Sequence, residues 1–180
     1  MSAMQFLVNT LFELYLMVVL LRFWLQLARA DFYNPFSQFV VKATHPIVGP
    51  LRRVLPSIGR MDTATLVLAL LVAGLKIVVL NLIAGNTNIN PLGLVIGSFY
   101  LVVKEALSLM MWVLIIRAIM SWVSQGYNPM DMVLGQLTEP LLAPIRRRLP
   151  SLGGLALPVM VVILVIIFLQ KLLGDVFGYF

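Results

Sequence analysis

The sequence predicts an all-α membrane protein with four transmembrane helices, arranged as two tandem two-helix repeats. Three observations support this prediction. First, 61% of the 180 residues are hydrophobic and only 11% are charged, whereas soluble domains carry about 25% charged residues. Second, four apolar segments are each long enough to cross a bilayer. Third, a block of polar and proline residues occurs twice, each time between two of these segments.

The four apolar segments lie at about 3–28, 63–84, 94–122 and 157–177. A helix needs roughly 20 residues to cross a hydrocarbon core of about 30 Å. Helices are expected because lipid cannot hydrogen-bond an exposed backbone, and the alternating pattern of barrel strands is absent. The N-terminus has no basic stretch and no clear cleavage site follows it. We therefore interpret the first segment as a span and not as a removable signal peptide.

Basic residues are concentrated in two of the three connections between spans. The first and third connections contain Arg29, Lys42, Arg52, Arg53 and Arg60, and Arg146, Arg147 and Arg148, respectively. The middle connection, residues 85–93, contains none. The positive-inside rule therefore places the first and third connections in the cytoplasm. Both termini are then expected on the outer side of the membrane.

The two halves of the chain match at a shift of 94 residues. Asn34 and Pro35 recur as Asn128 and Pro129. The further matches pair Thr44 with Thr138, Pro46 with Pro140, Pro50 with Pro144, Arg52-Arg53 with Arg146-Arg147, and Leu55-Pro56-Ser57 with Leu149-Pro150-Ser151. The sequence thus predicts two repeats, residues 1–85 and 94–180. They are expected to be parallel, because each contains an even number of spans.

Each basic connection is predicted to form a cytoplasmic amphipathic helical hairpin. Asn34 and Asn128 suit an N-cap, with a proline at the first helical position. Apolar residues then recur at helical spacing, in the sets Phe36, Phe39, Val40 and Ala43, and Met130, Val133, Leu134 and Leu137. We expect Pro46 and Pro140 to interrupt this helix, because proline removes a backbone donor. A short second helix would then end before Pro56 or Pro150.

The repeated pattern T-x-P-x-x-x-P-x-R-R-x-L-P-S-x-G, preceded by N-P, resembles the YggT family of bacterial membrane proteins. YlmG proteins and their plastid relatives belong to the same family. With the spans, the resemblance covers nearly the whole chain. It implies a bacterial inner-membrane protein, linked in relatives to cell division or nucleoid distribution, plastid cytochrome assembly and osmotic-stress tolerance. The copies differ where Arg60, Val54 and Asp62 stand opposite Gly154, Arg148 and Ala156, so the halves need not be equivalent.

Charged residues inside the spans are expensive and require partners. Glu13 and Lys76 lie at comparable depth in the first two spans, as do Glu105 and Lys171 in the last two. We therefore expect two ion pairs, Glu13 with Lys76 and Glu105 with Lys171. They would either hold each repeat together or contribute to a polar pathway between the repeats. Arg22 and Arg117, near the cytoplasmic ends of spans, are expected to extend toward the interface.

The arginines of the two connections form a candidate binding site for lipid or a partner. The residues are Arg52, Arg53, Arg146, Arg147 and Arg148. One interpretation is that they only set the topology of the chain. The other is a bidentate clamp for a lipid phosphate or for a carboxylate of a partner protein, since arginine suits that geometry. Lysine substitutions would distinguish the two, because lysine preserves the charge but not the fork of donors.

Other chemistries find little support in the sequence. There is no cysteine, and His45 is the only histidine, so no thiolate, multi-histidine metal site or nucleophile–histidine pair is expected. We expect no catalytic, cofactor-binding or metal-binding residue. The basic balance of +6 points to anionic lipid head groups and not to nucleic acid, because the charges lie between apolar spans.

Two functions remain as hypotheses. The first is a non-enzymatic scaffold or assembly factor that binds anionic lipid, or a membrane or cytoplasmic protein, through the basic hairpins. The second is a small transporter or channel for ion homeostasis, alone or as a homo-oligomer. The parallel duplication and the intramembrane charges favour the second. Four spans enclose little volume, however, and no span carries a run of polar residues, which argues against it.

Overall fold

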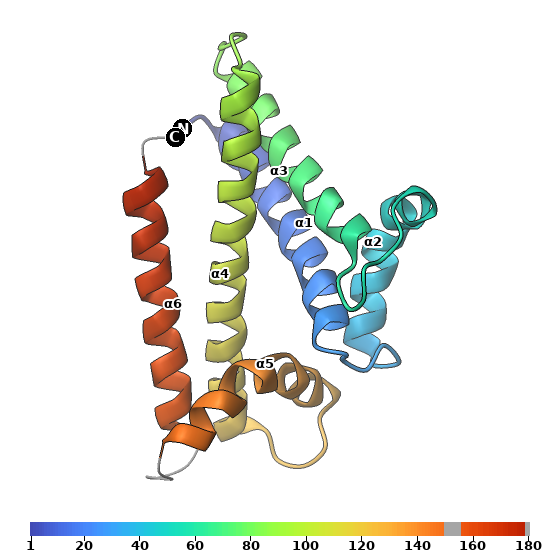
Figure 1. Ribbon diagram of the computed structural model, residues 1–180, viewed down its shortest axis with the longest axis vertical. Helices are drawn as coiled ribbons and strands as arrows, with labels where there is room; N and C mark the ends of the chain where they lie inside the picture. The colour runs from blue at the N-terminus through green and yellow to red at the C-terminus, as the bar shows by residue number, and fades with distance from the viewer. Residues whose placement is uncertain (150–155, 179–180) are drawn as a thin grey trace.

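The computed structural model describes residues 1–149 and 156–178, and this part of the chain contains six α-helices. They are α1 (Ala3–Leu27), α2 (Pro35–Val54), α3 (Thr63–Ile83), α4 (Pro91–Val123), α5 (Pro129–Arg148) and α6 (Ala156–Phe177). Figure 1 shows α1, α3, α4 and α6 as long helices side by side, with α2 and α5 lying across their lower ends. We call this end of the molecule the α2–α5 side.

The four predicted spans are confirmed as α1, α3, α4 and α6, each long and apolar enough to cross a membrane. The chain is therefore a multi-pass membrane protein. The main difference from the prediction is at the start of α4, which begins at Pro91 because Asn90 caps it. The Asn90 carboxamide oxygen accepts a hydrogen bond from the Leu92 amide at 3.0 Å. Asn-Pro thus begins three of the helices, α2, α4 and α5.

The helices pack around α1 and α4. Helix α1 packs against α2, α3 and α4, whereas α6 packs against α4 and α5. Buried side chains of α1 to α5 form one continuous core. A second, smaller cluster attaches α6 and consists of Leu114, Leu142, Val162 and Ile166. The packing among α1, α3 and α4 therefore buries more side chains than the cluster that attaches α6.

The predicted interruption at Pro46 and Pro140 is wrong. Helix α2 continues through Pro46 and Pro50, and α5 continues through Pro140 and Pro144. Each connection thus holds one bent helix instead of a hairpin of two (Figure 1). Prolines four residues apart lie on one helix face, so the carbonyls that lose a donor are grouped there. In α2 this face is exposed, where water or head groups can satisfy the carbonyls, and the helix bends instead of ending.

The buried face of α2 also differs from the predicted stripe. It consists of Ser37, Val40, Thr44 and Val48, whereas Phe39 is exposed. In α5 the predicted residues Val133, Leu134 and Leu137 are indeed buried, together with Thr138 and Leu142. In both helices a threonine thus occupies the buried face. Apolar periodicity alone did not indicate this, because a buried threonine hydroxyl needs a hydrogen-bond partner, which here comes from another helix.

Helices α2 and α5 are joined to each other by two hydrogen bonds. The Asn34 carboxamide caps α2 by accepting from the Phe36 amide at 3.0 Å, and its nitrogen donates to the Pro129 carbonyl at 2.8 Å. The Asp31 amide donates to the Gln136 side-chain oxygen at 2.9 Å. The N-terminal end of α2 and the loop before it are therefore attached to α5.

Asn34→Ala is expected to destabilise the protein more than Asn128→Ala. Both changes remove an N-cap, which costs about 1 kcal/mol. Only Asn34→Ala also leaves the Pro129 carbonyl without its donor, at a further cost of about 1 kcal/mol. Thermal unfolding in detergent measures both variants under identical conditions. Equal shifts in the melting temperature would show that the bond between α2 and α5 contributes nothing.

Candidate functional site

A buried arginine joins α1 to α2. Arg22 is only 3% exposed, and its Nη1 donates to the Thr44 hydroxyl at 2.8 Å and to the Val41 carbonyl at 3.3 Å. The Thr44 hydroxyl in turn donates to the Val40 carbonyl at 2.8 Å. The expectation that Arg22 extends toward the interface is wrong, because its side chain is buried against α2 and donates to oxygens there.

The same contact occurs in the second half. Arg117 of α4 donates through Nη1 to the Thr138 hydroxyl of α5, and that hydroxyl donates to the Leu134 carbonyl at 2.8 Å. The contact between the arginine and the threonine of each half was not predicted from the sequence. The signal was present, because both arginine and threonine recur at nearly the same shift.

In the first half, a second arginine joins the end of α2 to the start of α3. Arg52 Nη2 lies 2.5 Å from Asp62 Oδ2 and 2.9 Å from the Gln26 side-chain oxygen. Asp62 is fully buried, precedes the span as the N-cap of α3, and accepts from the Thr65 hydroxyl at 2.6 Å. Burial favours a higher pKa for Asp62, but hydrogen bonds from Arg52 and Thr65 outweigh it and hold the pKa below its usual value.

In the second half, the arginine that corresponds to Arg52 has a different partner. Ala156 follows at the position that corresponds to Asp62, so it provides no carboxylate for Arg146. Arg146 instead contacts Glu139, which lies seven residues, or two helical turns, earlier in α5. Its Nη1 lies 3.1 and 3.2 Å from the two carboxylate oxygens of Glu139. The ion pair of Arg146 is therefore internal to α5, whereas that of Arg52 joins α2 to the start of α3.

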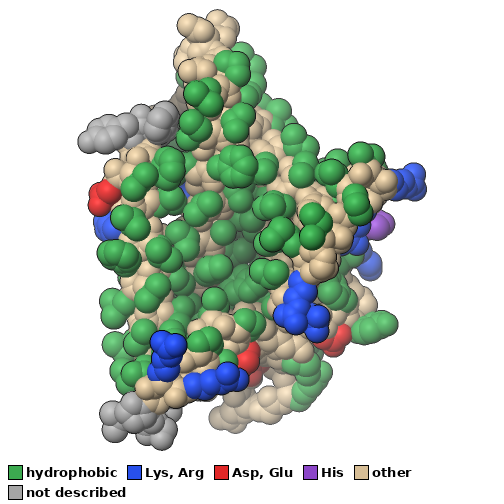
Figure 2. Space-filling model, in the orientation of Figure 1, with side chains coloured by type: hydrophobic (Ala, Val, Ile, Leu, Met, Phe, Trp, Pro, Cys, Tyr) green, Lys and Arg blue, Asp and Glu red, His purple; other side chains and the backbone are tan. Residues whose placement is uncertain are grey.

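The five arginines expected to bind lipid or a partner thus fall into two groups. Arg52 and Arg146 are engaged in ion pairs, whereas Arg53, Arg147 and Arg148 are exposed. Figure 2 shows lysine and arginine side chains mainly over the lower and right-hand parts of the molecule, where α2 and α5 lie, and apolar side chains over the spans. Arg53, Arg147 and Arg148 are therefore open to an external ligand without the loss of an ion pair.

The polar groups inside the spans are also brought together. Lys76 Nζ of α3 lies 3.1 Å from Glu13 Oε1 of α1, and the lysine side chain is only 6% exposed. Glu105 of α4 is buried and lies within electrostatic range of both residues. Three charged side chains from three spans therefore meet in the interior of the first unit.

The structure does not bring Glu105 and Lys171 together. Lys171 is exposed, and no ion pair joins the two within residues 1–149 and 156–178. The reason is register. The shift of 95 that relates Lys76 to Lys171 places Glu13 on Ser108, not on Glu105. Ser108 accepts a hydrogen bond from the Gln170 side chain at 3.4 Å, which is the polar contact between α4 and α6.

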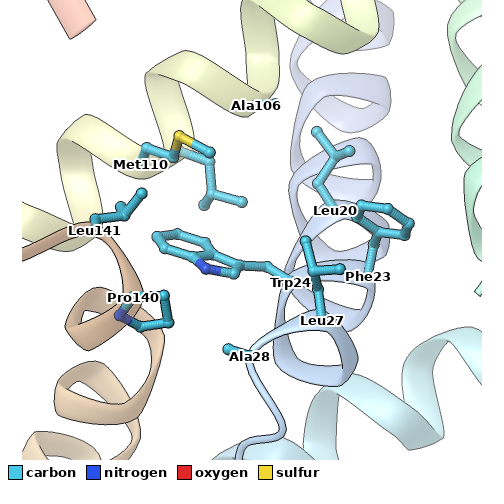
Figure 3. Close-up of a pocket in the computed structure, with 10 residues that line it drawn as sticks. Leu20, Phe23, Trp24, Leu27, Ala28, Ala106, Met110, Pro140 and Leu141 are labelled. Carbon is cyan, nitrogen blue, oxygen red and sulfur yellow. The ribbon is translucent and has the colours of Figure 1, made fainter. Parts of the chain in front are cut away.

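A small apolar pocket lies between α1, α4 and α5. Its volume is about 200 Å³. Figure 3 shows the Trp24 indole between Leu20 and Phe23 of α1 and Met110 and Leu141 of the neighbouring helices. The lining contains no charged side chain, so the pocket offers contacts to hydrocarbon and no acid–base chemistry.

The comparison with known families fits this arrangement. The CCB3/YggT family matches residues 1–83 and 96–177, two segments that together span almost the entire chain. The chain belongs to the CCB3/YggT family. Each matched segment of this YggT-family protein contains one arginine–threonine contact, one bent helix and two of the four spans.

Several proteins are similar to this YggT-family chain over most of their own length and most of its length. An uncharacterized protein in the proC 3′ region of Vibrio alginolyticus is 54% identical over 180 residues, covering 99% of this chain and 97% of that protein. The uncharacterized protein YggT of Escherichia coli K12 is 48% identical over 166 residues, covering 92% and 86%. A Pseudomonas aeruginosa relative is 46% identical, covering 87% and 80%. No solved structure matches the chain.

A double-mutant cycle is expected to show coupling between Arg22 and Thr44. Arg22→Met, Thr44→Val and the double variant should give a coupling free energy of about 1–2 kcal/mol, because the hydrogen bond is buried and one partner is charged. The unfolding free energy in detergent is the measurement. Thr10→Val is the control, since the Thr10 hydroxyl bonds only within α1. In the control cycle, Thr10→Val replaces Thr44→Val and is combined with Arg22→Met. Equal coupling free energies in the two cycles would contradict the hydrogen bond between Arg22 and Thr44.

Asp62 is expected to stabilise the protein only above about pH 4. Its pKa is lowered in the folded state relative to an unfolded value of about 3.9. Its contribution is therefore fully present above the unfolded pKa and is lost as the pH falls through the folded pKa. The difference in melting temperature between the native chain and Asp62→Asn should be constant from pH 8 to 5 and shrink below pH 4. A difference that persists unchanged to pH 3 would exclude this role.

Proposed function

We propose that this protein is a non-enzymatic organising or assembly factor of the bacterial inner membrane. Its α2 and α5 lie on the cytoplasmic side and hold a partner protein at the membrane through exposed arginines. The observation that carries this proposal is that α2 and α5 are attached to each other at one end of the molecule, each with exposed arginines in its last turn, namely Arg53, Arg147 and Arg148.

The distribution of charge supports the cytoplasmic assignment. Eight lysine and arginine residues lie in the two connections that contain α2 and α5, and none lies in the connection between α3 and α4. A bias of this kind is typical of cytoplasmic segments. In this orientation both termini face outward. The duplicated unit then presents its two basic helices to the same compartment.

The contacts inside the spans support a structural role for the buried charges. Lys76 is paired with Glu13 and lies near Glu105, and the pocket beside Trp24 is apolar. A pathway for ions needs groups that can release one partner and take another. The Lys76–Glu13 pair instead joins α1 to α3, and Glu105 of α4 lies within electrostatic range of it.

Site-specific photo-crosslinking in native membranes tests the proposal. Crosslinkers at Ile47 of α2 and Met130 of α5, both exposed, should form the same discrete protein adduct. A crosslinker at the exposed Leu92, in the first turn of α4 and next to the connection that lacks basic residues, should not. The adduct should disappear when Arg53, Arg147 and Arg148 are all changed to glutamine.

A lysine version of the same triple variant is the matched control. It preserves charge and therefore topology, but it lacks the donor fork of arginine. Loss of the adduct in this variant would identify a bidentate contact, and its retention would identify recognition by charge. An adduct that survives the glutamine changes would contradict the proposal. So would monovalent-cation flux through the purified protein in proteoliposomes.

A further inference from the structure

A polar cleft lies between the end of α1 and α2, on the opposite face of α1 from the Trp24 pocket. Its volume is about 550 Å³, and its lining consists of Arg22, Gln26, Phe32, Val41, Arg52 and Ser57. Two guanidinium groups therefore face one space, together with an amide and a hydroxyl. The neighbouring apolar pocket contains no such groups.

The arginines are held in place without using all their donors. A guanidinium has five N–H groups. The hydrogen bonds of Arg22 to Thr44 and Val41 both use Nη1, and those of Arg52 to Asp62 and Gln26 both use Nη2. These bonds fix the orientation of each side chain. They do not use Nε or Nη2 of Arg22, or Nε or Nη1 of Arg52. Donors that are already oriented lose little entropy when they bind an anion.

The charge at this cleft is not balanced. Arg22 and Arg52 contribute two positive charges, and the buried Asp62 beside Arg52 contributes one negative charge. In the second half, Arg117 and Arg146 lie near two acids, Glu139 and Asp131. Two carboxylates thus lie within electrostatic range of Arg117, and one of them, Glu139, pairs with Arg146. An anionic ligand would complete the balance in the first half only.

The position of the cleft matches the depth of lipid head groups. Helix α1 has 25 residues and is about 37 Å long, which exceeds a hydrocarbon core of about 30 Å. Arg22 lies five residues before the end of α1, or about 8 Å from it. The guanidinium groups are thus near the boundary between hydrocarbon and head groups, where phosphates of the bilayer lie.

We propose that this cleft binds a phosphate group, with Arg22 and Arg52 as the ligands and Gln26 and Ser57 as additional polar contacts. The fork of an arginine matches two phosphate oxygens. The phosphate can belong to an anionic phospholipid or to a soluble phosphate ester. This site lies in the first half alone and does not depend on the partner recruitment proposed above.

The test compares two variants that add the same charge in the two halves. Gln26→Glu is nearly isosteric, keeps an acceptor for Arg52, and places a carboxylate in the cleft. Ser121→Glu is its counterpart at the shift of 95, and Ser121 is exposed. Native mass spectrometry of the full chain, released from nanodiscs of phosphatidylcholine with phosphatidylglycerol, measures retained phosphatidylglycerol. Gln26→Glu should reduce retention about tenfold, and Ser121→Glu should not change it.

A second arm identifies the source of the phosphate. Thermal unfolding of the chain in phosphatidylcholine nanodiscs is measured with inorganic phosphate or glycerol 3-phosphate. Stabilisation that Gln26→Glu abolishes would support a soluble ester as ligand, whereas retention of phosphatidylglycerol alone would support the lipid. If Gln26→Glu fails to fold, Ser57→Glu replaces it, because Ser57 is exposed. Native-like binding by the cleft variant, an equal loss with Ser121→Glu, or no binding in either arm would overturn the proposal.

Discussion

A cation near the end of a membrane span must find oxygen ligands within the protein, because hydrocarbon offers none. Arg22 finds them in Thr44 and Val41 of α2, and Arg117 finds one in Thr138 of α5. This requirement determines how each bent helix is placed. Thr44 must face α1, so the hydrophobic face of α2 is rotated and Phe39 is left exposed. A simple count of apolar residues would have placed Phe39 inside.

Once α2 is fixed against α1, the rest of the first half follows. The end of α2 brings Arg52 to Asp62, and Asp62 caps α3 while it binds Arg52. One carboxylate thus begins a span and closes the connection that precedes it. The cleft between α1 and α2 is a consequence of the same geometry, because the middle of α2 holds Arg22 and the last turn of α2 carries Arg52. The second half has no acid at the matching position, and Arg146 pairs within α5 instead.

The two halves of the chain are therefore similar in architecture and different in charge. Both place a bent helix on the same side of the membrane, and both use an arginine–threonine contact. The first half carries a buried acid and an ion pair between its two spans, whereas in the second half Ser108 and Gln170 join α4 to α6. This difference in charge would permit the first half to bind an anionic ligand while the second mainly supports the fold.

Much of the fold could be predicted from the sequence by itself. The four spans, the N-caps at Asn34 and Asn128, and the family follow from hydropathy, local propensity and a repeated motif, which all act within a short stretch of chain. The continuity of α2 and α5 through their prolines could not be predicted in this way. It depends on which helix face is exposed, since only an exposed carbonyl can lose its donor cheaply.

The candidate sites required the tertiary structure for a similar reason. The sequence determined which residues carry charge, and it correctly placed Glu13 at the depth of Lys76. It did not determine that Glu105 lies near the residues of the first two spans instead of Lys171, because a shift of three residues rotates a side chain by about 60° and moves it about 4.5 Å along the helix. Nor did it reveal that Arg22 and Arg52 line one cleft. That proximity arises from the packing of α2 across α1, and packing is decided by contacts between segments that are distant in the chain.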